Sequence, residues 1–232
     1  MRGTLLGEVN EIRESGGAAV LATDLATGEQ TLLHPLSEMS GTNDPTLLAA
    51  ARQALSLDRS SVWADDDRHF FLHVFNPPVR VVLVGAVHIA QSLAAMAKEA
   101  GFEVSVVDPR EAFATAARFP GVDLRCAWPE PALAALGLDH RSAVVTVTHD
   151  PKVDDPALKA ALESPAFYIG ALGSKRTQAK RVERLREAGF DDTALVRIHA
   201  PVGLDIGARS PGEIAASVLA EIISVLRLGE DG

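Results

Sequence analysis

The chain has 232 residues, 47% of them hydrophobic, and a formal net charge of -9. This composition supports one large or two small globular domains and excludes an intrinsically disordered chain. An acidic surface repels phosphate backbones, so we expect no nucleic-acid binding. No run of about 18 apolar residues occurs, and acidic residues follow the start at once. We therefore expect a cytoplasmic protein with neither a membrane span nor a signal peptide.

The first part of the chain predicts a small mixed domain. Residues 18–35 indicate two strands joined around Thr27-Gly28, and residues 69–75 indicate another strand. Asp44 as N-cap and Pro45 at the first helical position predict a helix. The sequence Asn-Pro-Pro at 76–78 interrupts regular structure, because proline restricts its own backbone and that of its predecessor. We expect an α+β domain over residues 1–75 and a second domain over 76–232.

The second domain alternates apolar runs with helical patterns. Strands are predicted at 80–84, 103–108, 122–126, 143–148, 166–170 and 194–198. Helices are predicted at 90–100, 111–119, 131–137, 155–164 and 174–189, and a last one opens with Ser210, Pro211 and Glu213 in a capping-box pattern. Continuous rather than alternating apolar runs favour a parallel sheet covered on both faces. The pattern predicts a doubly wound, Rossmann-like α/β fold.

The sequence GAVHIA at 85–90 follows the first of these strands. It approximates the dinucleotide loop G-x-G-x-x-G/A, but Val87 takes the position where the backbone must approach a pyrophosphate. Gly85 and His88 would lie at an anion site, because a helix N-terminus offers free N–H groups. Asp108 ends the next strand and would meet a ribose hydroxyl. The alternatives are a turn kept for packing and an exposed or capping histidine.

Polar residues follow the strand at 143–148. His149 and Asp150 would lie beside Gly85 if this strand neighbours the first one, because ligands bind where the strand order of such sheets reverses. The pair could act as a base, a metal ligand or a hydrogen-bonding group. Alternatively, Asp150 before Pro151 caps the next helix.

A second glycine turn, at 170–176, leads into a basic helix. Gly170, Gly173 and Ser174 would leave N–H groups free, and Lys175 and Arg176 follow at the helix start. Cations at this end oppose the helix dipole, and a bound phosphate would compensate them. An apolar stripe through residues 179–188 predicts that all six basic residues between 175 and 186 face outward. The alternative is a solvated face paired with Glu183 and Glu187.

Two further features are less specific. The loop after residue 198 holds His199, Asp205 and Arg209 between glycines, which is common in functional loops; alternatively, Asp205 and Arg209 form an internal ion pair. Cys126 is the only cysteine, so no internal disulfide can form, and we expect a small buried thiol.

These segments together resemble the C-terminal Rossmann domain of the XdhC/CoxI family. The resemblance covers residues 78–228 in order, and it is most specific in YIGALGSKR and in PVGLDIGA. It implies a non-catalytic maturation factor that binds the molybdenum cofactor and delivers it to an apo molybdenum hydroxylase of the xanthine dehydrogenase type. A cysteine desulfurase as a further partner and a homodimer are also expected.

The chain departs from the family pattern in two places. Val87 replaces the second glycine of the family loop, although His88 remains. The segment 34–45 lacks the cysteine that typical members carry, which leaves the metal ligands unknown. The alternative functions are an NAD(P)-dependent oxidoreductase, which the fold and Asp108 favour, and a nucleotide-sensing protein that helps assembly. Fold alone does not establish an oxidoreductase, and Val87 argues against it.

Overall fold

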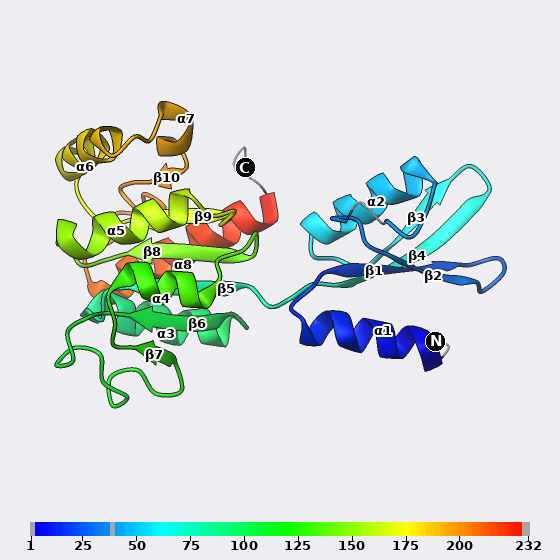
Figure 1. Ribbon diagram of the computed structural model, residues 1–232, viewed down its shortest axis with the longest axis horizontal. Helices are drawn as coiled ribbons and strands as arrows, with labels where there is room; N and C mark the ends of the chain where they lie inside the picture. Colours follow the sequence, from blue (N-terminus) through cyan, green and yellow to red (C-terminus); the bar gives the residue numbers. More distant parts are fainter. Residues whose placement is uncertain (1–2, 38–39, 229–232) are drawn as a thin grey trace. The chain divides into compact units, whose positions relative to one another are not determined.

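The computed structural model describes residues 3–37 and 40–228 (Figure 1). The chain forms two compact units, divided between Pro77 and Pro78. Residues 76–79 carry no regular secondary structure, as the two prolines require. In the described part, no helix is both long and apolar enough to cross a membrane.

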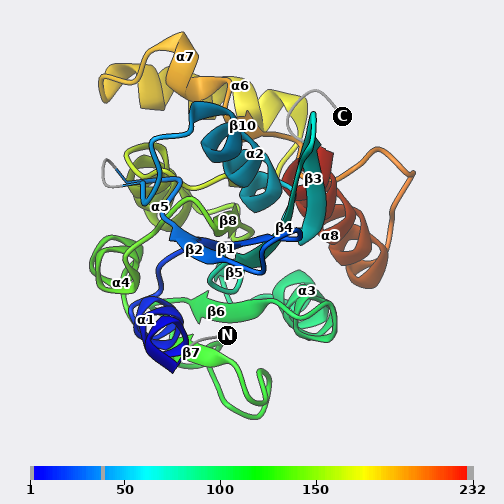
Figure 2. The ribbon, with the colours of Figure 1, turned by 90° about the vertical axis from the view of Figure 1, so that its right-hand side faces the viewer.

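The first unit is a four-stranded antiparallel sheet with one helix on each face (Figure 2). Its elements are α1 (Gly3–Glu14), β1 (Ala19–Asp24), β2 (Gln30–Leu33), α2 (Pro45–Ser56), β3 (Ser61–Asp65) and β4 (Arg68–Phe75). The sheet order is β2-β1-β4-β3. Successive side chains of β1 point to opposite faces, so Val20 packs toward α2 and Leu21 toward α1.

The predictions for this unit are confirmed in part. The strands on either side of Thr27-Gly28 form a hairpin, and the Asp44 carboxylate caps α2 by accepting the N–H groups of Thr46 and Leu47. The sequence interpretation missed α1 and β3. Helix α1 has only one fully buried apolar side chain among those described, Val9, and β3 is an edge strand with exposed positions, so both patterns are weak.

The second unit contains the predicted parallel sheet. Its six strands have the order β10-β9-β8-β5-β6-β7, which confirms the doubly wound α/β fold. The first three strands are β5 (Arg80–Val84), β6 (Glu103–Val107) and β7 (Asp123–Arg125), with α3 (His88–Glu99) between the first two. The rest are α4 (Pro129–Leu136), β8 (Ser142–Thr146), α5 (Pro151–Leu162), β9 (Tyr168–Ala171), α6 (Lys175–Glu187), α7 (Asp192–Leu195), β10 (Ile198–His199) and α8 (Pro211–Leu228).

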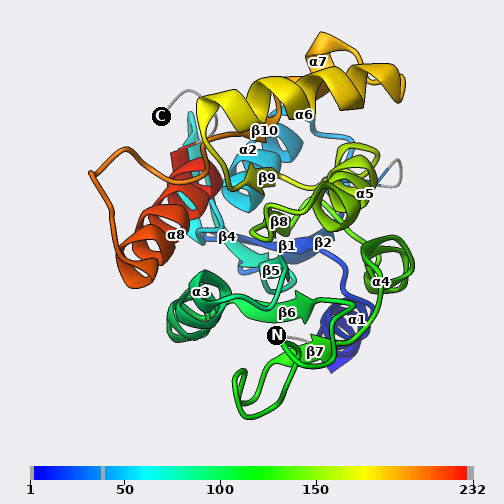
Figure 3. The same cartoon turned by 90° about the vertical axis from the view of Figure 1, so that its left-hand side faces the viewer.

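Helices cover both faces of this sheet. Figure 3 shows α3 and α8 on one side of the strands and α4 and α5 on the other. Val81 and Leu83 of β5 face α3 and α8, whereas Val82 and Val84 face α4 and α5. Both faces are apolar, which explains why the strands read as continuous hydrophobic runs.

Four local predictions for this unit were wrong. Residues 111–119 form turns instead of a helix, because the Arg118 guanidinium binds the Ala86 and Phe113 carbonyl oxygens and Phe119 is buried. Of residues 194–198, the first two end α7, the next two form a turn and only the last belongs to β10. Cys126 is exposed. The fourth error concerns α6, where Arg181 is buried and the Ala179 and Ala188 positions are exposed.

Candidate functional site

The carboxyl ends of the six parallel strands share one edge, and the strand order reverses between β5 and β8. The two strands are neighbours, as expected, with Val84 opposite Thr146. The turns that follow them are in close contact. A Cβ atom on Gly85 would lie 2.4 Å from Thr148 Cγ2, and the φ of Gly85 is +117°, so this position requires glycine.

The first glycine turn is held firmly by its own backbone. The Gly85 N–H donates to the Val107 carbonyl at 2.8 Å. Val87 is the N-cap of α3, gives no side-chain cap, and packs its side chain against the apolar cluster of α3 and α8. His88 is exposed. Because Val87 points toward the core, the free start of α3 remains available to an anion.

The Asp108 side chain holds this turn through a hydrogen bond to its backbone. Its carboxylate is fully buried and accepts the Ala86 N–H at 2.7 Å. It also accepts the Arg110 backbone N–H, Nε and Nη2 groups at 2.9, 2.9 and 2.7 Å. Burial acts to raise the pKa of Asp108, but these hydrogen bonds outweigh it and hold the pKa below its ordinary value. Four donors occupy the carboxylate, which leaves little capacity for a ribose hydroxyl.

Sequence reasoning missed the two arginines of this half. Arg110 pairs with Asp108 and lies over the Phe113 ring, 4.4 Å from its centroid. Arg118 donates to the Ala86 carbonyl at 2.8 Å and thus also holds this turn. The only available signal was the Asp-Pro-Arg sequence at 108–110, where the spacing lets Arg110 fold back on Asp108.

The turn after β8 has a strained backbone. His149 has a φ of +63°, which non-glycine residues rarely adopt, and its side chain is exposed. Asp150 caps α5 by accepting the Lys152 N–H at 3.0 Å, as the alternative interpretation expected. Its side chain is also exposed at the sheet edge. Thr148 Oγ1 donates to the buried Asp154 carboxylate at 2.7 Å.

The second glycine turn is the most cationic part of the edge. Gly173 has a φ of +146°, and Ser174 caps α6 by accepting the Thr177 N–H at 3.2 Å. Lys175 and Arg176 are exposed and form no ion pair within the described chain. Gly170 lies inside β9, where a Cβ would lie 2.6 Å from Val202 Cγ2, so its role there is packing.

The loop between β10 and α8 is anchored at its base. The Glu221 carboxylate accepts the Gly203 N–H at 2.8 Å and the Tyr168 hydroxyl, while His199 stacks on the Tyr168 ring at 4.6 Å. Burial raises the pKa of Tyr168, and its bond to the carboxylate adds to this. Asp205 is exposed.

Two expectations for this loop have different outcomes. No ion pair joins Asp205 to Arg209 in the described residues, so the internal-pair alternative is wrong. The capping box of α8 is confirmed, because the Ser210 N–H donates to Glu213 Oε2 at 2.9 Å and the Glu213 N–H to Ser210 Oγ at 3.3 Å.

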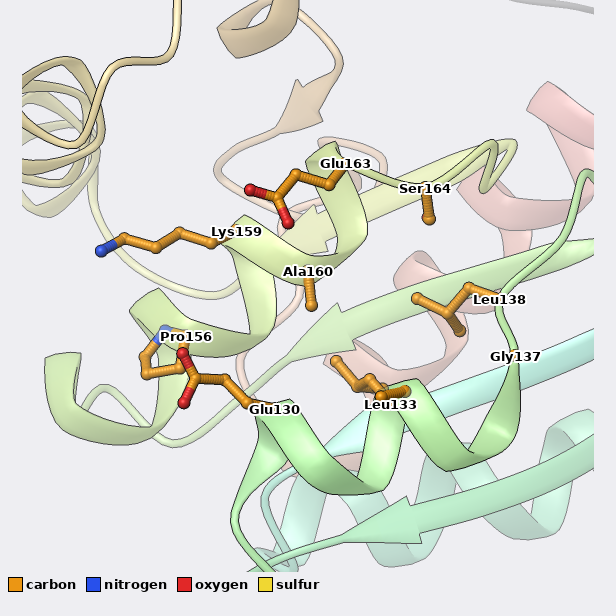
Figure 4. Close-up of a pocket in the computed structure, with 10 residues that line it drawn as sticks. Glu130, Leu133, Gly137, Leu138, Pro156, Lys159, Ala160, Glu163 and Ser164 are labelled. Atoms are coloured by element: carbon orange, nitrogen blue, oxygen red, sulfur yellow. The ribbon is translucent and has the colours of Figure 1, made fainter.

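A separate groove of about 440 Å³ lies between α4 and α5 (Figure 4). Leu133 and Leu138 line it, with Glu130, Lys159 and Glu163 at its rim. None of the predicted site residues lines this groove.

We place the candidate site at the sheet edge because free helix-start N–H groups occur there together with cations that are unpaired in the described residues. No cluster of three His, Cys, Asp or Glu side chains in the described residues could hold a metal ion.

Comparison with known proteins gives consistent matches. Residues 81–222 match the model of the XdhC Rossmann domain. The molybdenum cofactor insertion chaperone PaoD of Escherichia coli is 35% identical over 151 residues, which cover 65% of this chain and 41% of PaoD. A probable xanthine dehydrogenase subunit of Bacillus subtilis is 36% identical over 160 residues, which cover 68% of this chain and 46% of that protein. The chain therefore spans less than half the length of these relatives.

A solved structure matches both units. The crystal structure of a xanthine dehydrogenase from Bacillus halodurans aligns with a TM-score of 0.69 and 25% identity. The alignment covers 97% of this chain and 64% of that one.

Proposed function

The chain belongs to the family of the XdhC Rossmann domain, and from this we propose that it binds the molybdenum cofactor and delivers it to a molybdenum hydroxylase of the xanthine dehydrogenase type. The names of the relatives, an insertion chaperone and a xanthine dehydrogenase subunit, support this role. The cofactor is then cargo and the chain need not catalyse a reaction. A cysteine desulfurase partner, a homodimer and a cytoplasmic location stay predictions.

One observation carries the proposal: no acidic side chain in the described residues forms an ion pair with the cationic turn at Gly173–Arg176. Lys175 and Arg176 stand at the start of α6, where their charge opposes the helix dipole. A cofactor phosphate would compensate both charges and accept the free N–H groups of the turn. We assign the phosphate to this turn.

The flat pterin would then lie toward the point where the strand order reverses. His149 and Asp150 are exposed there and offer an imidazole and a carboxylate oxygen to the ring or to metal-bound oxygen atoms. His88 and Asp205 are further exposed polar groups on turns at this edge. Because the described residues hold no three-ligand metal group, retention would depend on the organic part of the cofactor.

The NAD(P)-binding alternative has less support. Its recognition of ribose depends on a free acid at the end of the second strand of the sheet. Asp108 holds that position, but its carboxylate is buried and already accepts bonds from Ala86 and Arg110. We therefore keep Asp108 in the site as the residue that shapes the first turn.

The test is cofactor retention by protein purified from a molybdate-fed, cofactor-competent host. Mass spectrometry should find the pterin cofactor with the unchanged protein. His149→Ala should lower the bound fraction about tenfold, equivalent to about 1.4 kcal/mol, and should lower activation of an apo-hydroxylase in parallel.

His149→Asn is the matched control for backbone strain, because asparagine tolerates a positive φ but lacks the imidazole. It should lose the cofactor as His149→Ala does. Full loading and full client activation by both variants would show that this edge is not the site.

A further inference from the structure

A buried ion pair lies beneath the two turns of the second half of the sheet. Asp154, in the first turn of α5, and Arg181, in the middle of α6, each have a side chain that is only 2% exposed. Sequence patterns did not indicate this pair, because Arg181 was expected to face the solvent with its basic neighbours. Two buried charges in a small domain require an explanation.

Each member of the pair holds one turn. Asp154 Oδ1 accepts the Thr148 hydroxyl at 2.7 Å and the Thr148 N–H at 3.3 Å, which fixes the residue directly before the strained His149. Arg181 Nη2 donates to the Leu172 carbonyl at 2.9 Å, directly before Gly173. Arg181 Nη2 and Asp154 Oδ2 are 4.0 Å apart. One continuous set of contacts thus runs from the turn after β8 to the turn after β9.

The pair is poorly suited to stabilise the fold. At 4.0 Å the two groups make no hydrogen bond to each other, and Arg181 Nε is buried with no hydrogen-bond partner among the described residues. Burial raises the pKa of Asp154 and lowers that of Arg181, so it disfavours the charged form of each. Apolar residues of similar volume are often as stable as such a pair. Apolar residues could not, however, make the hydrogen bonds by which the pair holds Thr148 and the Leu172 carbonyl.

The neighbouring ion pair gives the contrast. Asp155 and Arg184 join the same two helices through hydrogen bonds of 2.5 and 2.9 Å, and both side chains are more exposed. Neither side chain contacts the turn at 148–150 or the turn at 172–176 through a hydrogen bond. Linking α5 to α6 therefore does not require the buried pair.

We propose that Asp154 and Arg181 are positioning residues that set the separation of the two turns. A ligand that places a phosphate on Gly173–Arg176 and a ring against His149 would then meet both groups already in place, without ordering them on binding. The ring-bearing ligand depends on the function proposed above. The coupling of the two turns does not.

The first test uses Asp154→Asn and Arg181→Met in the full chain, with inorganic phosphate as the probe. Amide NMR signals of residues 148–150 and 172–176 should move in both variants, although each change touches only one turn. The affinity of the second turn for phosphate should fall about tenfold. Asp155→Asn, which removes the neighbouring pair, should move neither set of signals and should leave phosphate affinity unchanged. Arg181→Lys, which keeps the charge, should restore part of the affinity.

The second test separates positioning from folding. The double variant Asp154→Leu with Arg181→Met removes both charges at once, so it should melt at the same temperature as the unchanged protein or higher. It should still have lost phosphate affinity. A folded double variant that keeps this affinity, or an Asp154→Asn variant whose signals change only at 148–150, would overturn the proposal. If the turns respond together but the unchanged protein carries no cofactor, the proposed function fails and the positioning role stands.

Discussion

Asp108 and Asp154 are both buried beneath turns at the same sheet edge, yet their pKa values move in opposite directions. Asp108 has a guanidinium at 2.7 and 2.9 Å and two backbone N–H donors, and its pKa is lowered. The Arg181 guanidinium is 4.0 Å from Asp154, and burial keeps the pKa of Asp154 raised. For Asp108 the hydrogen bonds from Arg110 and Ala86 outweigh burial, whereas for Asp154 burial outweighs the bonds from Thr148.

The same contrast separates the two glycine turns. The first turn is held by Asp108, whose charge Arg110 balances, and by Arg118, whose guanidinium donates to the Ala86 carbonyl. The second turn carries Lys175 and Arg176 without partners in the described chain, above a pair that is only loosely matched. The charged side chains of the first turn are therefore engaged in hydrogen bonds within the domain, whereas Lys175 and Arg176 have none in the described chain and are available to a ligand.

The largest effect is expected from Gly85→Ala. The new Cβ would collide with Thr148 Cγ2, and the alanine backbone would have to adopt a φ of +117°. The free energy of unfolding should fall by about 2–4 kcal/mol, measured by urea denaturation. Gly101→Ala is the control, since Gly101 also has a positive φ but no atom near its Cβ position. Equal losses in the two variants would show that the contact between the turns carries no energy.

Asp108→Asn should have the next largest effect. It leaves an amide that cannot accept both Arg110 and Ala86 as the carboxylate does, which costs about 1–3 kcal/mol at neutral pH. Because the pKa of Asp108 is lowered, its contribution is present above the ordinary value of 3.8 and is lost as pH falls below it. The exposed pair of Asp123 and Arg125 offers a control, and Asp123→Asn should change stability by less than about 0.5 kcal/mol. A wild-type advantage that does not shrink as pH falls below 3.8 would contradict this account.

Asp154→Asn should show the opposite pH dependence. The amide keeps an acceptor for Thr148 but leaves the buried Arg181 guanidinium without its acid. The pKa of Asp154 is raised, so its carboxyl stabilises the fold best below 3.8. That contribution declines as pH rises through the raised pKa. Denaturation of both proteins between pH 3 and pH 8 measures this as a difference curve. A difference that grows in favour of the unchanged protein as pH rises would reverse the sign and refute the assignment.

The sequence predicted the parallel sheet and its glycine turns well, because continuous apolar runs and the residues at helix starts are local signals. It predicted neither the buried pair of Asp154 and Arg181 nor the hydrogen bond from Arg118 to the first turn. In each case a charged side chain contacts a residue of another element: Arg181 of α6 pairs with Asp154 of α5, and Arg118 donates to the Ala86 carbonyl after β5. Helical periodicity assigns such residues to the solvent. The same limit explains the false helix at 111–119, where tertiary contacts overrode local propensity.

The smallest effect tests the second turn directly. Removing Lys175 or Arg176 by alanine substitution takes away a charge that opposes the dipole of α6. Each change should therefore raise the free energy of unfolding by about 0.3–1 kcal/mol at low salt. The gain should shrink as salt screens the charges. It should also shrink when phosphate is added, because phosphate stabilises the unchanged turn more than a turn that has lost one cation. Lys180→Ala, on the same helix beyond its first turn, is the control and should show neither response. If both alanine variants lose stability in phosphate-free buffer, Lys175 and Arg176 have partners of their own, and the second turn has no unbalanced charge for a ligand to neutralise.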